Sequence, residues 1–256
     1  MSQGIRSLAN KKLGQHFLKD QTVIHKIVDC LPSNIEQIIE VGPGLGALTS
    51  QLRQLSKPLL LIEKDSRFVD HWKNEQIEII QYDAMKLDWH KLQHDYQFTP
   101  KSVWLVSNLP YNISAPLTVK FLPHIYISDM TLMYQKEVAE KILGSDVMGS
   151  LHMLCSNFFS IKKVLNVKPG AFIPPPKVDS TVLHFKRLPA TKVKIEDIQA
   201  FEKFLRTLFS TPRKQLKSVL AALGTSKSPI ALDLTRRAET LTCEEVYAIY
   251  FSYQQF

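Results

Sequence analysis

The stretch Gln-Ile-Ile-Glu-Val-Gly-Pro-Gly-Leu-Gly at residues 37–46 decides the fold class. Its first half is a short, β-branched apolar run that is typical of a buried strand. Its second half places glycines at positions 42, 44 and 46, where the backbone can turn sharply and approach a ligand. Apolar residues then recur at helical spacing from Ala47 to Leu55. We predict a strand, a glycine turn and a helix whose first amides face a ligand; a tight turn without a ligand is the alternative.

Further strand signals extend this unit into a sheet. Apolar runs occur at residues 59–62, 77–80 and 103–106. Each run is short and almost continuously apolar, as strands buried on both faces of a parallel sheet are. Helical patterns separate the runs, which predicts a doubly wound, Rossmann-like α/β sheet. Later strand candidates, which predict an antiparallel closing hairpin, lie at residues 131–134, 158–167 and 178–185.

The flanking segments differ from the sheet region. The first 20 residues are mainly polar and basic, and we expect an arm, followed by an amphipathic helix over residues 21–31. After Leu188 only helical spacing remains, at residues 195–209, 214–223 and 243–251. We therefore predict an α/β domain over residues 1–187 and a small all-helical domain over residues 188–256.

The composition narrows the class of protein. The 256 residues carry 32 Lys and Arg against 24 Asp and Glu, a formal net charge of +8, which favours a polyanionic partner. No apolar run approaches the roughly 18 residues needed to cross a bilayer, and no secretory signal is visible, so we expect a soluble cytoplasmic protein without a membrane partner. The three cysteines are far apart, which argues against a disulfide framework or a zinc site.

Two carboxylates follow strand candidates at the predicted ligand edge of the sheet. Glu63 lies about 20 residues after the glycine turn, where a carboxylate can accept both hydroxyl hydrogens of a ribose. This spacing suits any adenosine-containing cofactor, so NAD and S-adenosylmethionine fit equally well at this point. If the cofactor is the methyl donor, Asp83 can accept the adenine amino group; an exposed loop aspartate is the alternative.

The turn at residues 108–111, directly after the fourth run, favours the methyl donor. The exocyclic amine of adenine is a poor nucleophile because its lone pair is delocalised into the ring. The side-chain oxygen of Asn108 and the carbonyl of Leu109 or Pro110 can accept its two hydrogens, while Tyr111 can stack on the base, an interaction worth roughly 1–3 kcal/mol. We therefore predict methylation of an adenine that is flipped or single-stranded, by direct displacement and without a metal ion.

Five blocks occur in order along the chain: GQHFL at residues 14–18, EVGPGLG at 40–46, NLPYNIS at 108–114, QKEVA at 135–139 and FIPPPKVDS at 172–180. With these blocks the chain resembles the ribosomal RNA adenine N6,N6-dimethyltransferase family, and specifically its bacterial 16S type. The resemblance implies an S-adenosylmethionine-dependent enzyme that dimethylates two adjacent adenosines in the 3′-terminal hairpin loop of 16S rRNA. It also implies action on the small subunit or its precursor during ribosome biogenesis. We expect a monomer, although the sequence carries no signal for or against a dimer.

The resemblance implies roles for individual residues. S-adenosylmethionine is expected to contact His16, Leu18, Gly42, Glu63, Asp83 and Asn108. Asn108, Leu109, Pro110 and Tyr111 form the expected catalytic turn. Position 16 is often Asn in this family, which matters little if the contact is made through the main chain. Phe172 is similar to an aromatic residue that holds the other face of the flipped adenine; a core aromatic beside a proline-rich turn is the alternative.

The helical tail is a candidate RNA-binding region. It carries ten basic and seven acidic residues from Leu188 onward, and its basic side chains include Arg213, Lys214 and Lys217. Such a run is often only a solvated face, but next to an RNA-modifying site phosphate contact is the better interpretation.

Three other functions remain possible at this point. One is a large-subunit rRNA dimethyltransferase of the antibiotic-resistance type, which shares the chemistry. Another is a DNA adenine methyltransferase, in which a second proline more often stands in place of Leu109. The third is a non-catalytic ribosome assembly factor on the same fold, against which the complete set of Glu63, Asp83 and Asn108 argues.

Overall fold

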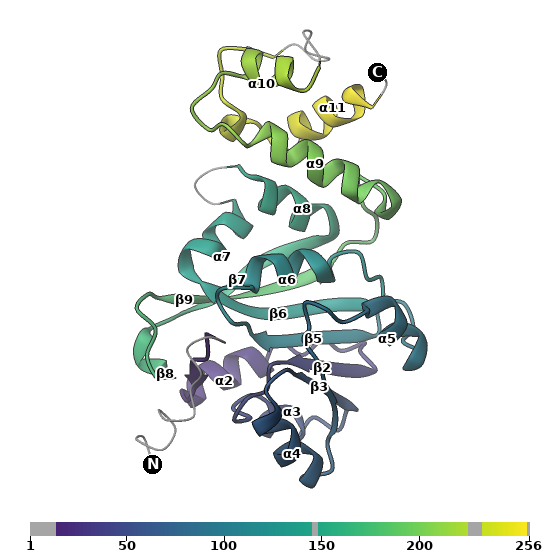
Figure 1. The fold of residues 1–256 in the computed structure, drawn as a ribbon, viewed down its shortest axis with the longest axis vertical. Helices are drawn as coiled ribbons and strands as arrows, with labels where there is room; N and C mark the ends of the chain where they lie inside the picture. The colour runs from purple at the N-terminus through teal and green to yellow at the C-terminus, as the bar shows by residue number, and fades with distance from the viewer. Residues whose placement is uncertain (1–13, 145–147, 225–231, 255–256) are drawn as a thin grey trace. The chain divides into compact units, whose positions relative to one another are not determined.

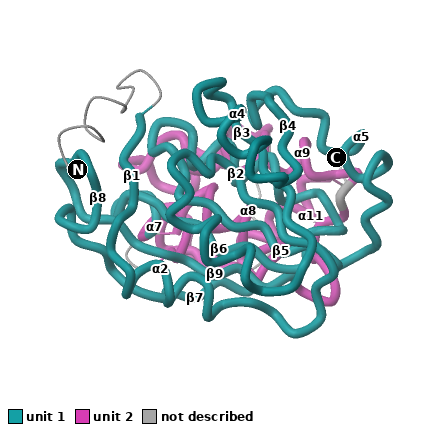
Figure 2. The backbone as a smooth tube through the Cα atoms, turned by 90° about the horizontal axis from the view of Figure 1, so that it is seen from below, with its two compact units in different colours: residues 1–139, 160–187 teal, residues 140–159, 188–256 magenta. Residues whose placement is uncertain are grey.

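The computed structural model describes residues 14–144, 148–224 and 232–254, so most of the predicted basic arm lies outside the described residues. The chain divides into two compact units, which Figure 2 shows in different colours. The first unit comprises Met1–Ala139 and Ser160–Arg187, and the second comprises Glu140–Phe159 and Leu188–Phe256. Besides the tail expected after residue 188, the second unit thus includes a segment from the middle of the chain.

The first unit is built on a seven-stranded sheet with the order β4-β3-β2-β5-β6-β9-β7 (Figure 1). Its strands are β2 (Gln37–Val41), β3 (Leu59–Glu63), β4 (Glu78–Gln81), β5 (Val103–Asn108), β6 (Ile127–Gln135), β7 (Phe159–Val167) and β9 (Ser180–Arg187). The pairs from β4 through β3, β2 and β5 to β6 are parallel, and β9 runs antiparallel to β6. The structure therefore confirms the doubly wound sheet and its antiparallel end.

Helices alternate with the parallel strands. They are α2 (Gln21–Val28), α3 (Thr49–Leu52), α4 (Ser66–Asn74), α5 (Trp89–Asp95) and α6 (Ser114–Phe121). Ile38 and Ile39 are neighbours in β2 and point to opposite faces of the sheet, yet both are fully buried. Both faces of the central strands are thus covered, as the short, mostly apolar run of β2 predicts.

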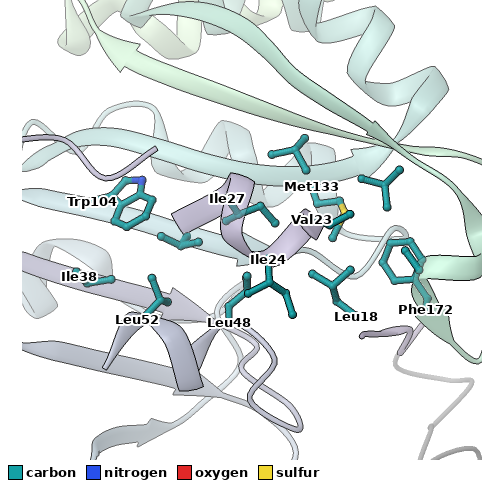
Figure 3. Close-up of a cluster of buried hydrophobic side chains, with 14 of the residues drawn as sticks. Leu18, Val23, Ile24, Ile27, Ile38, Leu48, Leu52, Trp104, Met133 and Phe172 are labelled. Carbon is teal, nitrogen blue, oxygen red and sulfur yellow. The ribbon is translucent and has the colours of Figure 1, made fainter. Parts of the chain in front are cut away.

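One core cluster joins α2 to the sheet (Figure 3). Val23, Ile24 and Ile27 lie on one face of the helix and pack with Ile38 of β2 and Trp104 of β5. Asp20 caps the helix by accepting hydrogen bonds from the two backbone amides of residues 22 and 23. The predicted amphipathic helix is confirmed, although it ends at Val28 rather than at residue 31.

Strand β6 begins at Ile127, four residues before the predicted strand. The prediction missed this first part because Asp129, a buried acid, interrupts the apolar run. The carboxylate of Asp129 is 4% exposed and faces His184 Nε2 of β9 at 3.1 Å. This partner offsets the cost of burying the acid, so the strand continues through a position that looks polar in the sequence.

The second unit is helical. Its helices are α8 (Ser150–Phe158), α9 (Ile198–Leu208), α10 (Leu216–Ala222) and α11 (Cys243–Tyr253), and α7 (Lys136–Leu143) enters it from the first unit. Phe201 and Phe204 of α9 contact Tyr250 of α11 with ring centroids 4.8 and 5.2 Å apart. The three helical patterns of the tail are thus confirmed. None of the helices in the described ranges is long and apolar enough to cross a membrane.

A side-chain clamp explains why residues 140–159 belong to the second unit. The amide of Asn157 in α8 is fully buried, and it both donates to the carbonyl of Val193 and accepts from its N–H, at 3.0 and 2.9 Å. Leu188 N–H also donates to the Phe158 carbonyl at 2.8 Å. These bonds tie the start of the tail to α8, a pairing over more than 30 residues that no local pattern indicates.

The remaining elements are short. A two-stranded sheet pairs β1 (Phe17–Leu18) antiparallel with β8 (Phe172–Ile173), and 3₁₀ turns occupy Pro169–Ala171, Ile195–Asp197 and Ala238–Thr240. The small sheet matters because it brings the first block of the sequence beside the last one.

Candidate functional site

A cavity of about 200 Å³ opens at the carboxyl ends of the parallel strands. The strand order changes direction between β2 and β5, and ligands of open α/β sheets bind at such a point. The structure brings together around this cavity the predicted contacts His16, Leu18, Gly42, Glu63, Asp83, Asn108, Leu109, Pro110 and Tyr111. Residues that are up to about a hundred positions apart in the chain therefore share one wall.

The glycine turn forms the floor of the cavity with bare backbone. Gly42, Gly44 and Gly46 all have positive φ angles, +71°, +51° and +82°, which side chains disfavour. A Cβ on Gly46 would lie 2.2 Å from the Trp72 ring, so Trp72 packs directly against the turn. The Trp72 indole also donates to the Gly44 carbonyl at 3.1 Å. Trp72 thus fixes the turn on one side, and the other side leaves its backbone available to a ligand in the cavity.

Glu63 lies at the end of β3 with a largely buried carboxylate, 6% exposed. One oxygen accepts the Gly44 N–H at 3.1 Å and the other accepts the Asp65 N–H at 2.8 Å. Burial raises the pKa of Glu63, and these backbone hydrogen bonds oppose the shift. The carboxylate is therefore held in one orientation, and each oxygen keeps a lone pair for a further donor such as a ribose hydroxyl.

Asp83 lies beyond β4 at the same edge. Its carboxylate accepts the Met85 N–H at 3.0 Å and forms an ion pair with Lys64 at 2.9 Å. Partial burial works against ionisation, but the hydrogen bonds from Lys64 and Met85 outweigh it and lower the pKa of Asp83. The group is thus a fixed, charged acceptor at the cavity wall.

The turn after β5 presents acceptors in a fixed arrangement. The side-chain amide of Asn108 donates to the His16 carbonyl at 2.9 Å, which leaves its oxygen as an acceptor. The Pro110 carbonyl accepts the Ile113 N–H at 3.1 Å, which uses one of its two lone pairs, so the carbonyls of Leu109 and Pro110 both remain candidates for the second acceptor. Tyr111 shares a hydrogen bond with Ser180 through its hydroxyl. The arrangement can hold an amino group by both of its hydrogens.

Comparison of the whole chain with known protein families agrees with this site. A family model described as "Ribosomal RNA adenine dimethylase" matches residues 6–255. The chain belongs to the ribosomal RNA adenine dimethylase family. The predicted resemblance and the predicted enzyme class, an rRNA adenine dimethyltransferase, are therefore confirmed.

Similar proteins of this family cover nearly the whole chain. A "Ribosomal RNA small subunit methyltransferase A" from Bdellovibrio bacteriovorus is 38% identical over 94% of this chain and 91% of that protein. A protein of the same name from Leptothrix cholodnii is 33% identical over 98% of this chain and 94% of its own length.

Solved structures agree on the fold. A dimethyladenosine transferase from Plasmodium falciparum superposes with a TM-score of 0.76 at 25% identity, covering 94% of this chain and 98% of that one. The 23S rRNA methyltransferase ErmE superposes with a TM-score of 0.67 at 20% identity, covering 93% of this chain and 100% of that one. The likeness to ErmE concerns the fold alone.

Among the cavity residues that were not predicted as site residues is a buried acid, Glu40. Glu40 in β2 lines the cavity, is 2% exposed, and accepts a hydrogen bond from Thr49 Oγ1 at 2.7 Å. Burial raises its pKa to about 8, the Thr49 bond opposes the shift, and the nearby charge of Glu63 adds to it. The sequence did contain a signal for Glu40. An acid inside an apolar, β-branched run is costly to bury, so its presence there indicates a special role.

Phe172 does not line the cavity. Its side chain is 1% exposed and belongs to the core cluster with Leu18, which it faces in the pairing of β1 with β8. This placement agrees with the alternative interpretation, a core aromatic beside the proline-rich turn. Contact with a flipped base stays a prediction for this residue.

The predicted phosphate contacts lie in the second unit. Arg213, Lys214 and Lys217, which we call the basic segment, are all exposed and take part in no ion pair with any described residue. By contrast, Arg236 is 2.7 Å from Glu245 and Arg237 is 3.8 Å from Glu239. The unit thus neutralises its later arginines internally and leaves the charge of the basic segment to solvent.

Proposed function

We propose that this chain transfers methyl groups from S-adenosylmethionine to the N6 amines of two adjacent adenosines in the 3′-terminal hairpin loop of 16S rRNA. The observation that carries the proposal is the side-chain amide of Asn108, held by the His16 carbonyl at 2.9 Å so that its oxygen is an acceptor in the cavity. The small-subunit names of the similar proteins support the choice of substrate.

The cavity residues fit the methyl donor chemically. Glu63 offers both carboxylate oxygens to a ribose, and Asp83 offers an acceptor to an adenine amine. The bare glycine turn lets a ligand approach the backbone closely. The acidic side chains also favour a positively charged sulfonium group. When bound, the donor supplies an electrophilic methyl group.

The chain's own residues then orient the nucleophile. The Asn108 side-chain oxygen and the carbonyl of Leu109 or Pro110 accept the two hydrogens of the target amine, which concentrates its lone pair on nitrogen. Tyr111 stacks on the base and limits its rotation. The nitrogen becomes acidic only after it has gained the methyl group, and its proton passes to water. Catalysis therefore rests on positioning and on electrostatic arrangement rather than on a strong base.

We assign RNA binding to the second unit, through the basic segment. Its exposed cations can neutralise phosphates and release counterions, whereas ion-paired arginines contribute less. We further propose that the protein acts as a cytoplasmic monomer on the small subunit or its precursor.

The direct test is methylation of purified particles. The protein is incubated with labelled S-adenosylmethionine and either unmethylated small subunits or protein-free large-subunit rRNA, and the nucleosides are analysed. We expect N6,N6-dimethyladenosine in small-subunit rRNA only. Label in large-subunit rRNA would favour the antibiotic-resistance type, and no label in either RNA, under conditions where a related active enzyme labels, would favour a non-catalytic assembly factor.

A further inference from the structure

His16 connects three segments that are far apart in the chain. Its carbonyl accepts the side-chain amide of Asn108, 92 residues later, at 2.9 Å. Its ring nitrogen Nδ1 lies 2.8 Å from the carbonyl of Pro174, 158 residues later. The same ring stacks on Tyr111, with centroids 5.6 Å apart and planes inclined by 25°. One residue thus contacts both ends of the turn at 108–111 and the block that begins with β8.

The hydrogen bond to Pro174 fixes the orientation of the imidazole and shows which of its nitrogens carries a hydrogen. A carbonyl oxygen can only accept, so Nδ1 of His16 carries the hydrogen in this contact. The ring is therefore held edge-on to Pro174 and cannot rotate about its Cβ–Cγ bond without losing the bond. Its face stays against Tyr111.

Tyr111 is held at two places as a consequence. Its ring face rests on His16, and its hydroxyl shares a hydrogen bond with Ser180 at the start of β9. Burial raises the pKa of Tyr111, in agreement with a phenol that is packed rather than free. Without the His16 ring, Tyr111 would keep the hydrogen bond of its hydroxyl but lose the contact that rests on its ring face.

The backbone around His16 is shaped for this contact. Gly14 has a φ of +64°, and a Cβ there would lie 3.2 Å from the side-chain oxygen of Asn112. Two residues after His16, Leu18 pairs with Phe172, and the Lys19 N–H donates to the Ala171 carbonyl at 2.8 Å. Before His16, the Gln15 side chain donates to Asp65 at 3.1 Å. The segment is thus held on both sides of His16, so the position of its ring is set by the fold.

We propose that His16 is a positioning residue whose imidazole sets the plane of Tyr111, and hence of the target base, while its carbonyl sets the orientation of the Asn108 amide. The inference rests on the proposed function of the turn at 108–111. It goes beyond the contact to S-adenosylmethionine expected at position 16, because it assigns the side chain a task in presenting the nucleophile. The carbonyl's task survives any substitution at this position, whereas the ring's task does not.

Three variants separate the tasks of the ring. His16→Ala removes the Pro174 bond and the stacking, His16→Phe keeps a stacking ring, and His16→Asn keeps a side-chain N–H donor. We expect His16→Ala to lower the single-turnover methylation rate roughly tenfold, as expected for one neutral hydrogen bond and one ring contact. The Kd of S-adenosylhomocysteine should stay within about twofold, because the main chain is retained. Each of the other two variants should recover part of the rate.

The control is His25→Ala, which removes an exposed histidine from α2 and should change neither quantity. The inference is overturned if His16→Ala methylates within about twofold of the unmodified rate. It is also overturned if the affinity for S-adenosylhomocysteine and the thermal midpoint fall together with the rate, since a purely structural role would produce that result.

A second measurement tests the same contact without any methylation. Nitration of Tyr111 by tetranitromethane, mapped by mass spectrometry, should become faster in His16→Ala, while nitration of the exposed Tyr82 should not change. Unchanged nitration of Tyr111 would show that the His16 ring does not hold it. An enzyme that fails on small subunits but shows the nitration difference would therefore contradict the proposed function and leave the positioning contact supported.

Discussion

The cavity in the first unit and the basic segment in the second are built in opposite ways. In the cavity, the side chains of Glu63, Asp83 and Asn108 each have at least one hydrogen-bond partner from elsewhere in the chain. In the basic segment, all three cations are exposed and none pairs with a described acid. This difference indicates that methyl transfer depends on side chains held in fixed orientations, whereas phosphate contact depends mainly on positive charge. Variants in the two regions should therefore fail in different ways.

The largest expected effect is that of Asn108→Ala. Removing the acceptor that faces the amine should lower the single-turnover methylation rate by about 100-fold or more, in line with the loss of one preorganised transition-state contact. The affinity for small subunits, measured by filter binding, should not change. Asn34→Ala, in an exposed loop, is the matched control and should retain the full rate. A rate near that of the unmodified enzyme would remove the turn from the mechanism.

Glu63→Gln should mainly weaken donor binding. The amide keeps one acceptor oxygen but turns an NH₂ group toward Gly44, Asp65 or the ribose, where only acceptors are useful. We expect calorimetry with S-adenosylhomocysteine to show a Kd roughly 10- to 100-fold higher. Glu75→Gln, at an exposed ion pair with Arg53, should leave this Kd unchanged. An unaltered Kd in Glu63→Gln would place the ribose elsewhere.

Glu40 should make stability depend on pH. Its pKa rises from 4.5 to about 8 in the folded protein because of burial, so the native state holds more protons than the unfolded state between these values. The free energy of unfolding should therefore fall as pH rises from about 4.5 to 8, by at most about 1.4 kcal/mol per pH unit. Glu40→Gln should flatten this decline, and its stability at pH 8 should exceed that of the parent protein. Parallel denaturation curves for both proteins across this range would contradict the burial account.

Neutralising the basic segment should have the smallest effect. It should change the affinity for small subunits and the dependence of that affinity on salt concentration. The triple change of Arg213, Lys214 and Lys217 to Gln should weaken binding to small subunits roughly tenfold at physiological salt, and reduce the salt slope by about 2. Arg237→Gln removes the same kind of charge from the same unit but from an ion pair, and should change the slope less. A slope that the triple variant leaves intact would exclude the basic segment from RNA contact.

The same contrast explains which features could be predicted from the sequence. The strands β2, β3 and β5 are short and mostly apolar, and the glycine turn needs backbone conformations that few residues other than Gly adopt. These are local properties, so pattern alone located them. The cavity followed because polar residues at the carboxyl ends of parallel strands must converge at one edge of the sheet.

Features that depend on distant partners could not be found in this way. Asp129 looks like a break in β6 until His184 of β9 is placed beside it. Residues 140–159 join the second unit because the buried Asn157 clamps Val193, which the sequence separates from it by 36 positions. The sequence left open whether Phe172 is a core residue, because its burial depends on the pairing of β1 with β8. In each case the deciding interaction joins residues that share no local pattern.

The central claim is that the cavity sets the rate of methyl transfer while the basic segment sets RNA affinity. The most direct test measures both quantities, on unmethylated small subunits, for Asn108→Ala and for the triple Gln variant of the basic segment side by side. We expect Asn108→Ala to keep its affinity and lose its rate. We expect the triple variant to lose affinity at physiological salt and to recover the full single-turnover rate at low salt and saturating subunits. A triple variant that stays slow at saturation, or an Asn108→Ala variant that loses affinity in proportion to its rate, would contradict the claim.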